Sequence, residues 1–178
     1  MHILEHLRTV NRHRHLVRKY CFRLGLYWQG LTHDLSKYSP TEFWRSAKYY
    51  QGYRSPNDQE RLVNGVSLSW LHHKGRNRHH FEYWTDYNLA RKCVMPIKMP
   101  LKYVIEMFCD RVAASKTYMK DKYTDAYPLE YFERGKSTRS IDPETSALLE
   151  KLLIMLRDEG EKKTFRYIRK ELKKHKDY

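Results

Sequence analysis

The hydrophobic residues of this chain recur at helical intervals, and runs that alternate between apolar and polar residues are almost absent. From Ile3 to Leu24 the apolar positions are spaced by three, four or seven, which predicts one long helix. A second apolar stripe over residues 101–112 predicts a helix that opens after Pro100 and is buried on two sides. The pattern therefore predicts an all-α protein.

Three further helix starts carry capping signals. Ser39 and Glu42 form a capping box around a proline in the first turn. Ser55 stands before another proline, with an acidic residue near the positive end of the expected helix. Asp142 opens a late helix that Gly160 is placed to close.

Length and charge define the expected organisation of the chain. With 178 residues we expect one domain, a helical metal-binding unit over residues 1–160, followed by a basic C-terminal helix over 161–178. Residues 120–140 are polar, aromatic and irregular, typical of a long loop or short helical turns. Lys and Arg number 35 against 21 Asp and Glu, and the resulting charge of +14 attracts polyanions such as nucleotides or nucleic acid.

Cysteine content and hydropathy favour a cytoplasmic protein. The three cysteines are odd in number and widely spaced, which is typical of reduced thiols. No hydrophobic run approaches the length of a membrane span, and charges interrupt the N-terminus where a secretory signal needs an apolar core.

Candidate chemistry lies in isolated histidines and aspartates. His13 falls on the apolar stripe of the first expected helix, whereas His15 faces solvent. His33 and Asp34 are adjacent, and on a helix two neighbours diverge enough to wrap one metal or to bridge two. Asp110 lies in the central helix, where a buried carboxylate needs a partner, either a metal or an arginine.

Four more histidines crowd into nine residues, in two pairs separated by KGRNR: His72, His73, His79 and His80. Imidazole and carboxylate bind borderline divalent metals, so these residues predict a metal-dependent enzyme. A second ion, if one binds, would use Asp34 as a bridge together with one histidine of each pair; we favour His72 and His79, with His73 and His80 close behind.

Charged side chains accompany these candidate ligands. Lys37 follows Asp34 by three residues, and Arg76 and Arg78 flank the histidine pairs, so all three are candidates to hold a substrate phosphate. Glu82 follows the second pair and is a candidate acid/base or a partner that orients a histidine.

Together, His13, His33, Asp34 and Asp110 resemble the H…HD…D pattern of the HD-domain superfamily of metal-dependent phosphohydrolases. The additional histidines resemble its binuclear branch, which includes cyclic-dinucleotide phosphodiesterases and di-iron oxygenases. HDLSK and HHFE are similar to motifs of the former, although Ser36 replaces a glycine and the expected Gly-Tyr-Pro is missing. The blocks GLTHDLSKYSPTEF, YYQGYRSPN and WLHHKGRNRHHFEYW are similar to an uncharacterised family of small bacterial and phage proteins.

This resemblance implies a helical bundle of HD-domain type that binds one or two divalent ions, whether Mn, Fe, Zn, Ni or Mg. It implies hydrolysis of a nucleotide or another phosphoester through a metal-activated water. Two alternatives stay open: a di-iron oxygenase that uses the same ligands, and a basic nucleic-acid-binding protein with a structural metal.

Overall fold

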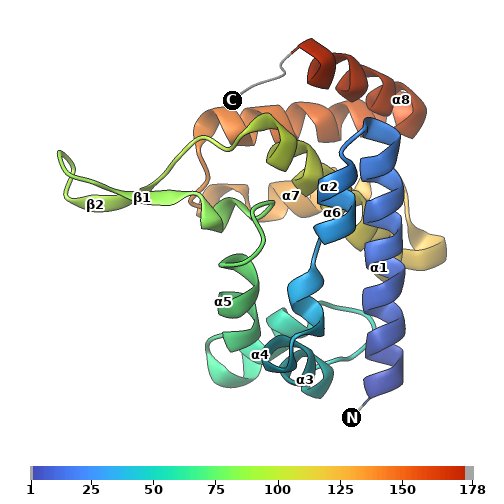
Figure 1. The fold of residues 1–178 in the computed structure, drawn as a ribbon, viewed down its shortest axis with the longest axis vertical. Coiled ribbons are helices and arrows are strands. Elements are labelled where there is room, and N and C mark those ends of the chain that lie inside the picture. Colours follow the sequence, from blue (N-terminus) through green and yellow to red (C-terminus); the bar gives the residue numbers. More distant parts are fainter. Residues whose placement is uncertain (1, 175–178) are drawn as a thin grey trace.

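Two long helices form the centre of the molecule in the computed structural model, which describes residues 2–174. Helix α1 (Ile3–Leu24) has the predicted bounds and ends where Gly25 adopts the left-handed conformation at φ 82°. Helix α6 (Leu101–Met119) packs against α1 and crosses behind it in Figure 1. Because α6 is covered on several sides, its Phe108, Cys109 and Val112 are fully buried.

Shorter helices pack on both sides of this central pair. On one side α3, α4 and α5 contact one another and α3 contacts α1; on the other side α7 and α8 cover α6, while α2 packs on α1. Their bounds are α2 (Tyr27–Thr32), α3 (Pro40–Lys48), α4 (Pro56–Asn64), α5 (Leu68–Lys74), α7 (Tyr127–Arg134) and α8 (Pro143–Lys174). Short 3-10 turns occur at Leu35–Tyr38, Phe81–Tyr83, Lys120–Lys122 and Lys136–Thr138.

The three predicted capping residues all lie at helix starts, but only two of them make the capping hydrogen bond. The Ser39 hydroxyl accepts a hydrogen bond from the Glu42 backbone N–H, as a capping box requires. The Glu42 carboxylate, however, points to the histidines of α5 instead of back to its own cap. Asp142 accepts from the backbone N–H of Thr145 at the start of α8, whereas the Ser55 side chain makes no capping hydrogen bond to α4.

The basic C-terminal segment docks on the core through its apolar side chains. Gly160 interrupts α8 at φ 76° and ψ 168°, so the helix changes direction there. Beyond it, Phe165 and Ile168 are buried in the core while the charged side chains face outward. Residues 175–178 of the expected C-terminal helix lie outside the described residues.

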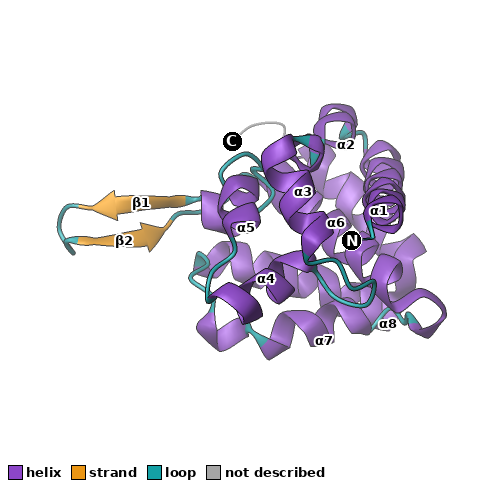
Figure 2. Ribbon diagram, turned by 90° about the horizontal axis from the view of Figure 1, so that it is seen from below, coloured by secondary structure: helices purple, strands orange, loops and turns teal. Residues whose placement is uncertain are grey.

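A β-hairpin was not predicted from the sequence. Strands β1 (Thr85–Asn88) and β2 (Cys93–Pro96) pair antiparallel, with Thr85 opposite Pro96, and project from the helical body (Figure 2). Each strand is four residues long and all of β1 is exposed, so neither face needs the apolar alternation that reveals a half-buried strand. Residues 120–140 contain one true helix, α7, between short turns.

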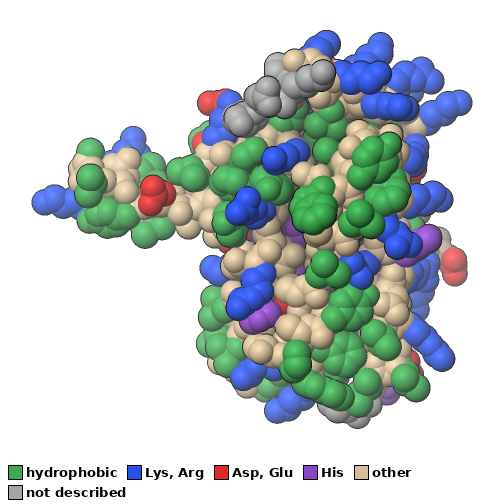
Figure 3. All heavy atoms as spheres, viewed as in Figure 1, with side chains coloured by type: hydrophobic (Ala, Val, Ile, Leu, Met, Phe, Trp, Pro, Cys, Tyr) green, Lys and Arg blue, Asp and Glu red, His purple; other side chains and the backbone are tan. Residues whose placement is uncertain are grey.

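The exposed surface is mixed in character. Lys and Arg side chains are spread over the face drawn in Figure 3, and hydrophobic side chains gather on it and along the hairpin. The exposed apolar residues include Tyr27, Trp28 and Leu31 of α2. In the described part of the chain, no helix combines the length and apolar character needed to span a bilayer. Cys21, Cys93 and Cys109 are all free thiols.

Candidate metal centre

His33 and Asp34 occupy a break between helices, and not a helix as the sequence suggested. Helix α2 ends at Thr32, and Asp34 adopts the left-handed conformation at φ 55° and ψ 24° before the 3-10 turn. Asp is one of the few residues that tolerate this region. The break turns both side chains inward, and they are 2% and 1% exposed.

Gly30 allows this break to approach α1 closely. A Cβ atom at Gly30 would lie 3.0 Å from the Cβ of Cys21 and 3.0 Å from the Phe22 ring. Contacts that short are tighter than most Cβ atoms make, so any larger residue at position 30 would require Cys21 and Phe22 to shift. The packing brings His33, just beyond α2, against the inward face of α1.

The first group of candidate ligands joins three segments of the chain: His13, His33, Asp34 and Asp110 each offer an atom within 4.8 Å of the others. The Nε2 atom of His13 lies 3.0 Å from Asp110 Oδ1 and 3.4 Å from Asp34 Oδ2. The Nε2 atom of His33 lies 3.4 Å from the same Asp34 oxygen. His15 is exposed, as the phase of the helix predicts.

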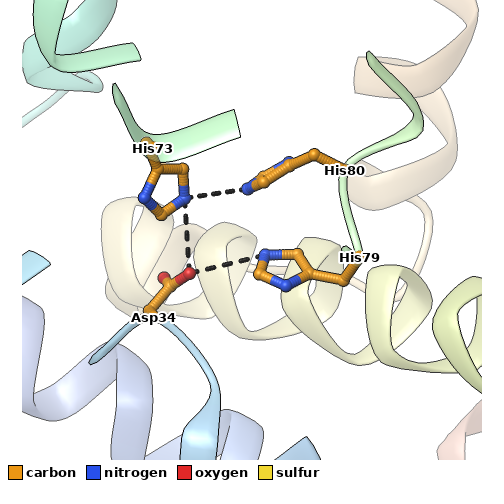
Figure 4. A group of neighbouring side chains, drawn as sticks. All are labelled: Asp34, His73, His79 and His80. Carbon is orange, nitrogen blue, oxygen red and sulfur yellow. Dashed lines mark hydrogen bonds and ion pairs between the residues drawn. The ribbon is translucent and has the colours of Figure 1, made fainter. Parts of the chain in front are cut away.

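The second group lies on the other side of the same carboxylate and comprises Asp34, His73, His79 and His80 (Figure 4). The Nε2 atoms of His73 and His79 lie 3.3 and 3.4 Å from Asp34 Oδ1, and His80 Nε2 lies 2.8 Å from His73 Nε2. Asp34 therefore directs one oxygen to each group, as the predicted bridging ligand would.

His72, the favoured member of its pair, lies outside both groups. In α5 the buried face carries Ser69 and His73, four residues apart, and His72 is turned about 100° away from it. Its Nδ1 atom lies 3.2 Å from Glu42 Oε2, and its side chain is partly exposed. The structure thus brings His73, His79 and His80 to Asp34, but not His72.

Two glutamates that were not predicted as site residues orient these histidines. Glu106 Oε1 lies 2.9 Å from Nδ1 of His33 and 3.2 Å from Nδ1 of His79. Glu42 Oε1 lies 2.6 Å from Nδ1 of His73. Since a carboxylate accepts the Nδ1 proton, each ring keeps its Nε2 lone pair for the interior of the group.

A signal for one of these glutamates is present in the sequence. Glu106 precedes Asp110 by four residues, so both acids lie on one face of α6. Glu42 is harder to find, because its position in a capping box already explains it.

The unpaired atoms at the centre fit a divalent cation. Asp34 Oδ1 and the Nε2 atom of His79 are buried without a hydrogen-bond partner, and Asp34 Oδ2 has the Lys37 ammonium 2.7 Å away. The Nε2 atoms of His13 and His33 face each other at 3.4 Å, where only one of them can carry a proton. Imidazole and carboxylate donors converge here, and one or two divalent ions would satisfy all of them at once.

The electrostatics favour positive charge at the same place. Burial acts to raise the pKa of Asp34, yet the neighbouring His33 and Lys37 hold it well below its usual range. Burial acts to lower the pKa of His33, yet the Asp34, Asp110 and Glu106 carboxylates raise it well above its usual range. Without a metal, the carboxylates therefore favour protonation of the neighbouring histidines. The same negative charge would attract a metal cation.

A cavity of about 790 Å³ opens above the two groups. His13, His73, His80 and Asp110 form part of its wall, whereas His33, Asp34 and His79 lie beneath them and are almost fully buried. The cations that line it are Lys37, Arg54, Arg61, Arg111 and Arg139. Its size is that of a typical small-molecule site.

Lys37 lies where its spacing from Asp34 predicts. Its Nζ atom is 2.7 Å from Asp34 Oδ2, and its side chain is 28% exposed on the cavity wall. Burial acts to lower the pKa of Lys37, but the Asp34 and Asp110 carboxylates raise it, so the ammonium keeps its charge.

Arg76 and Arg78 do not reach this cavity. Asn77 between them is buried, and its amide donates to Ser36 Oγ and to the His73 carbonyl. The loop therefore turns residue 77 inward and its two neighbours outward. Arg76 is exposed and contacts the His72 carbonyl, and Arg78 is exposed beside the Tyr103 hydroxyl.

Glu82 lines the cavity and belongs to neither group of candidate metal ligands. Burial raises the pKa of Glu82, and its Oε2 atom is buried without a hydrogen-bond partner. No contact of Glu82 with a histidine occurs among residues 2–174, so the histidines are oriented by Glu42 and Glu106 instead.

The chain belongs to the family of unknown function DUF5662, which matches residues 2–155. The match spans every candidate ligand, from His13 to Asp110, and leaves out only the last part of α8. No curated protein and no solved structure matches the chain. The family gives no reaction, so the chemistry of the site is the basis for a function.

Proposed function

We propose that this protein is a metal-dependent phosphohydrolase of the HD type that acts on a nucleotide or another phosphoester. The observation that carries the proposal is the sharing of one buried carboxylate, Asp34, between two groups of metal donors at the base of a cationic cavity. The order of the donors along the chain is that of the H…HD…D pattern, with His13, His33, Asp34 and Asp110 in the corresponding places.

The donor set supports one or two divalent ions. His13, His33, Asp34 and Asp110 would hold the first, and Asp34, His73, His79 and His80 the second. When bound, such an ion acidifies a water molecule and polarises a phosphoryl group. Mn²⁺, Fe²⁺, Zn²⁺ and Ni²⁺ suit this mixture of imidazole and carboxylate, and Mg²⁺ suits it less.

The protein's own side chains supply the remaining requirements of phosphoester hydrolysis. Lys37, fixed beside Asp34, can donate to a phosphoryl oxygen and stabilise the charge that develops on it. Burial raises the pKa of Glu82, which makes this carboxyl the candidate to protonate a leaving alcohol. Glu42 and Glu106 keep the histidines in the tautomer with a free Nε2.

The charge of the cavity favours a phosphoester over a neutral substrate. Four arginines and one lysine line it together with the carboxylates of Glu42, Asp58, Glu82 and Asp110. Arg61 pairs with Asp58, whereas Arg54, Arg111 and Arg139 form no ion pair among the described residues and are available to an anionic substrate. An oxygenase with an uncharged substrate has no need of these three cations. A nucleic-acid-binding protein with a structural metal would use the buried atoms of Asp34 and His79 as well, so turnover is the property that distinguishes it from an enzyme.

The test is turnover of p-nitrophenyl phosphate and a panel of nucleotides by protein loaded with Mn²⁺, Fe²⁺ or Zn²⁺. We expect hydrolysis that a chelator abolishes, that the double variant His33→Ala/Asp34→Ala lacks, and that the matched surface variant His15→Ala retains. An iron-loaded, coloured protein that consumes O₂ and hydrolyses no phosphoester would instead identify an oxygenase. Salt-sensitive binding to RNA or DNA without turnover would identify a nucleic-acid-binding protein.

A further inference from the structure

Arg111 is a cation on the cavity wall that the proposed chemistry does not use. It follows Asp110 directly on α6, and adjacent side chains on a helix diverge by about 100°. Asp110 points to His13 in the first metal group, at 3.0 Å. Arg111 therefore lines a different part of the same cavity, on the side of α7, where it lies over the ring of Phe132.

The guanidinium of Arg111 has no anionic partner. Its Nε atom is buried without a hydrogen bond, and no carboxylate of residues 2–174 lies within ion-pair distance of the side chain. Its neighbour Asp110 is engaged by histidines, and Glu82 lines the same cavity with its own Oε2 atom unpaired. A buried guanidinium nitrogen without a hydrogen bond is energetically unfavourable. An anion from outside the chain would supply the missing hydrogen bond and ion pair.

Arg139 adds a second positive charge at this place. Its guanidinium lies 5.4 Å from the Phe132 ring centre, while that of Arg111 lies 5.7 Å from the same centre. Arg139 is held there because it donates to the backbone carbonyls of Phe132 and Tyr131. The two like charges are thus fixed around one ring, and neither neutralises the other.

Gly135 makes room for this arrangement. A Cβ atom at residue 135 would lie 2.7 Å from Arg139 Nη2 and 3.0 Å from its Cζ. Any side chain there would push the guanidinium from its place over Phe132. The positive region is therefore built into the turn that follows α7.

From these observations we propose that Arg111, supported by Arg139, forms a second anion-binding subsite in the cavity. The substrate is then a phosphoester whose leaving group carries another anionic group, a phosphate or a carboxylate. The assignment of the phosphoryl group to the metal centre rests on the proposed function, whereas the anion site at Arg111 does not. The cavity volume of about 790 Å³ accommodates a molecule with two such groups.

The experiment uses non-hydrolysable probes, so that binding is measured without turnover. Alkylphosphonates have one anionic end, ω-phosphonoalkanoates add a carboxylate, and alkane bisphosphonates add a second phosphonate. Chains of two to six carbons cover the unknown separation of the two ends. Affinities for the Mn²⁺-loaded protein are measured by calorimetry at one free metal concentration.

We expect the best dianionic probe to bind the wild type about tenfold or more tightly than the alkylphosphonate of the same length, because its second anionic group adds charge-assisted hydrogen bonds. Arg111→Gln should erase this preference and lower the affinity for alkylphosphonates much less than the affinity for the dianionic probe. Arg111→Lys should restore part of it. Arg157→Gln, which removes an exposed arginine of α8, is the control and should change neither affinity.

Which of the two dianionic series binds more tightly identifies the second group as carboxylate or phosphate. A preference that survives in Arg111→Gln would overturn the subsite, as would the lack of any preference or of any phosphonate binding in the wild type. Failure of the proposed function is a separate result: phosphoesters are not hydrolysed with any metal, while the Arg111-dependent preference remains.

Discussion

The Nδ1 atom of His33 lies 2.9 Å from Oε1 of Glu106, and the same oxygen is 3.2 Å from Nδ1 of His79. One buried glutamate therefore sets the tautomer of a histidine in each of the two candidate metal groups. Glu106 also forms a group of three possible ligands with His33 and His79. As acceptor of the Nδ1 protons, it determines which ring nitrogen is free to bind a metal in the two groups of four.

Replacing Glu106 with alanine should weaken metal binding at both groups. Partners of this kind contribute about 10- to 100-fold to metal affinity. Glu106→Gln should lose less, because its amide oxygen can still accept the Nδ1 proton. Competition titration with a chromogenic chelator measures the affinity, and Glu159→Ala on the exposed face of α8 is the control. Unchanged affinity in Glu106→Ala would mean that the histidines need no orienting partner.

The two members of the first histidine pair should behave differently. His73→Ala removes a donor 3.3 Å from Asp34 Oδ1, so the protein should bind fewer metal ions per chain. His72→Ala removes a ring that pairs with Glu42 and belongs to neither group of candidate ligands, so the metal content should stay within experimental error of the wild type. Elemental analysis of both variants after dialysis against Mn²⁺ decides this. A larger loss in His72→Ala would reverse the assignment within the pair.

Lys37→Gln should separate catalysis from metal binding. The ammonium lies on the cavity wall 2.7 Å from Asp34, and its loss removes a donor to the phosphoryl group while leaving every candidate ligand in place. We expect kcat/KM to fall by about 10- to 100-fold at near-wild-type metal content. Lys48→Gln, at an exposed position of α3, is the matched control. Wild-type turnover by Lys37→Gln would show that the Lys37 ammonium does not bind the phosphoryl group.

His6 should make the free energy of unfolding depend on pH. Its ring is buried between Phe43 and Tyr50, and burial together with the charge of Lys37 lowers its pKa to about 4. Between pH 6.5 and 4 the unfolded chain takes up a proton that the folded protein does not, so this contribution to stability is present above pH 6.5 and is lost as the pH falls toward 4.

Urea unfolding at pH 7 and pH 5 tests this dependence. The wild type should lose up to about 2 kcal/mol more than His6→Leu between the two pH values. His15→Leu, at an exposed position of the same helix, should keep the wild-type dependence. Equal losses in wild type and His6→Leu would show that His6 is protonated in the folded protein.

Much of the fold follows from local patterns in the sequence. Helix α1 has its predicted bounds because apolar spacing and Gly25 specify both its face and its end. The inward position of His13 and the outward position of His15 follow from the same phase. The β-hairpin was missed because its strands bury no face, so its sequence lacks the alternation that marks a strand.

The site was only partly predictable, because it depends on loops and on contacts between distant segments. The break at Asp34, with φ 55°, has no marker in the sequence other than the tolerance of Asp for that conformation. The loop after α5 is ordered by Asn77 bonding to Ser36, forty-one residues away, and this bond places Arg76 outside the cavity. The role of Arg111 depends likewise on helix α7 and the turn after it.

Metal stoichiometry in Asp34→Asn tests the central claim most directly, since Asp34 is the one residue that belongs to both candidate groups of four. Protein purified without chelator is dialysed against Mn²⁺ or Zn²⁺ and analysed for bound ions, with circular dichroism to confirm folding. The shared carboxylate predicts that the wild type binds one or two ions per chain and that Asp34→Asn loses affinity at both groups together. Wild-type stoichiometry and affinity in a folded Asp34→Asn would contradict a metal centre built on this residue.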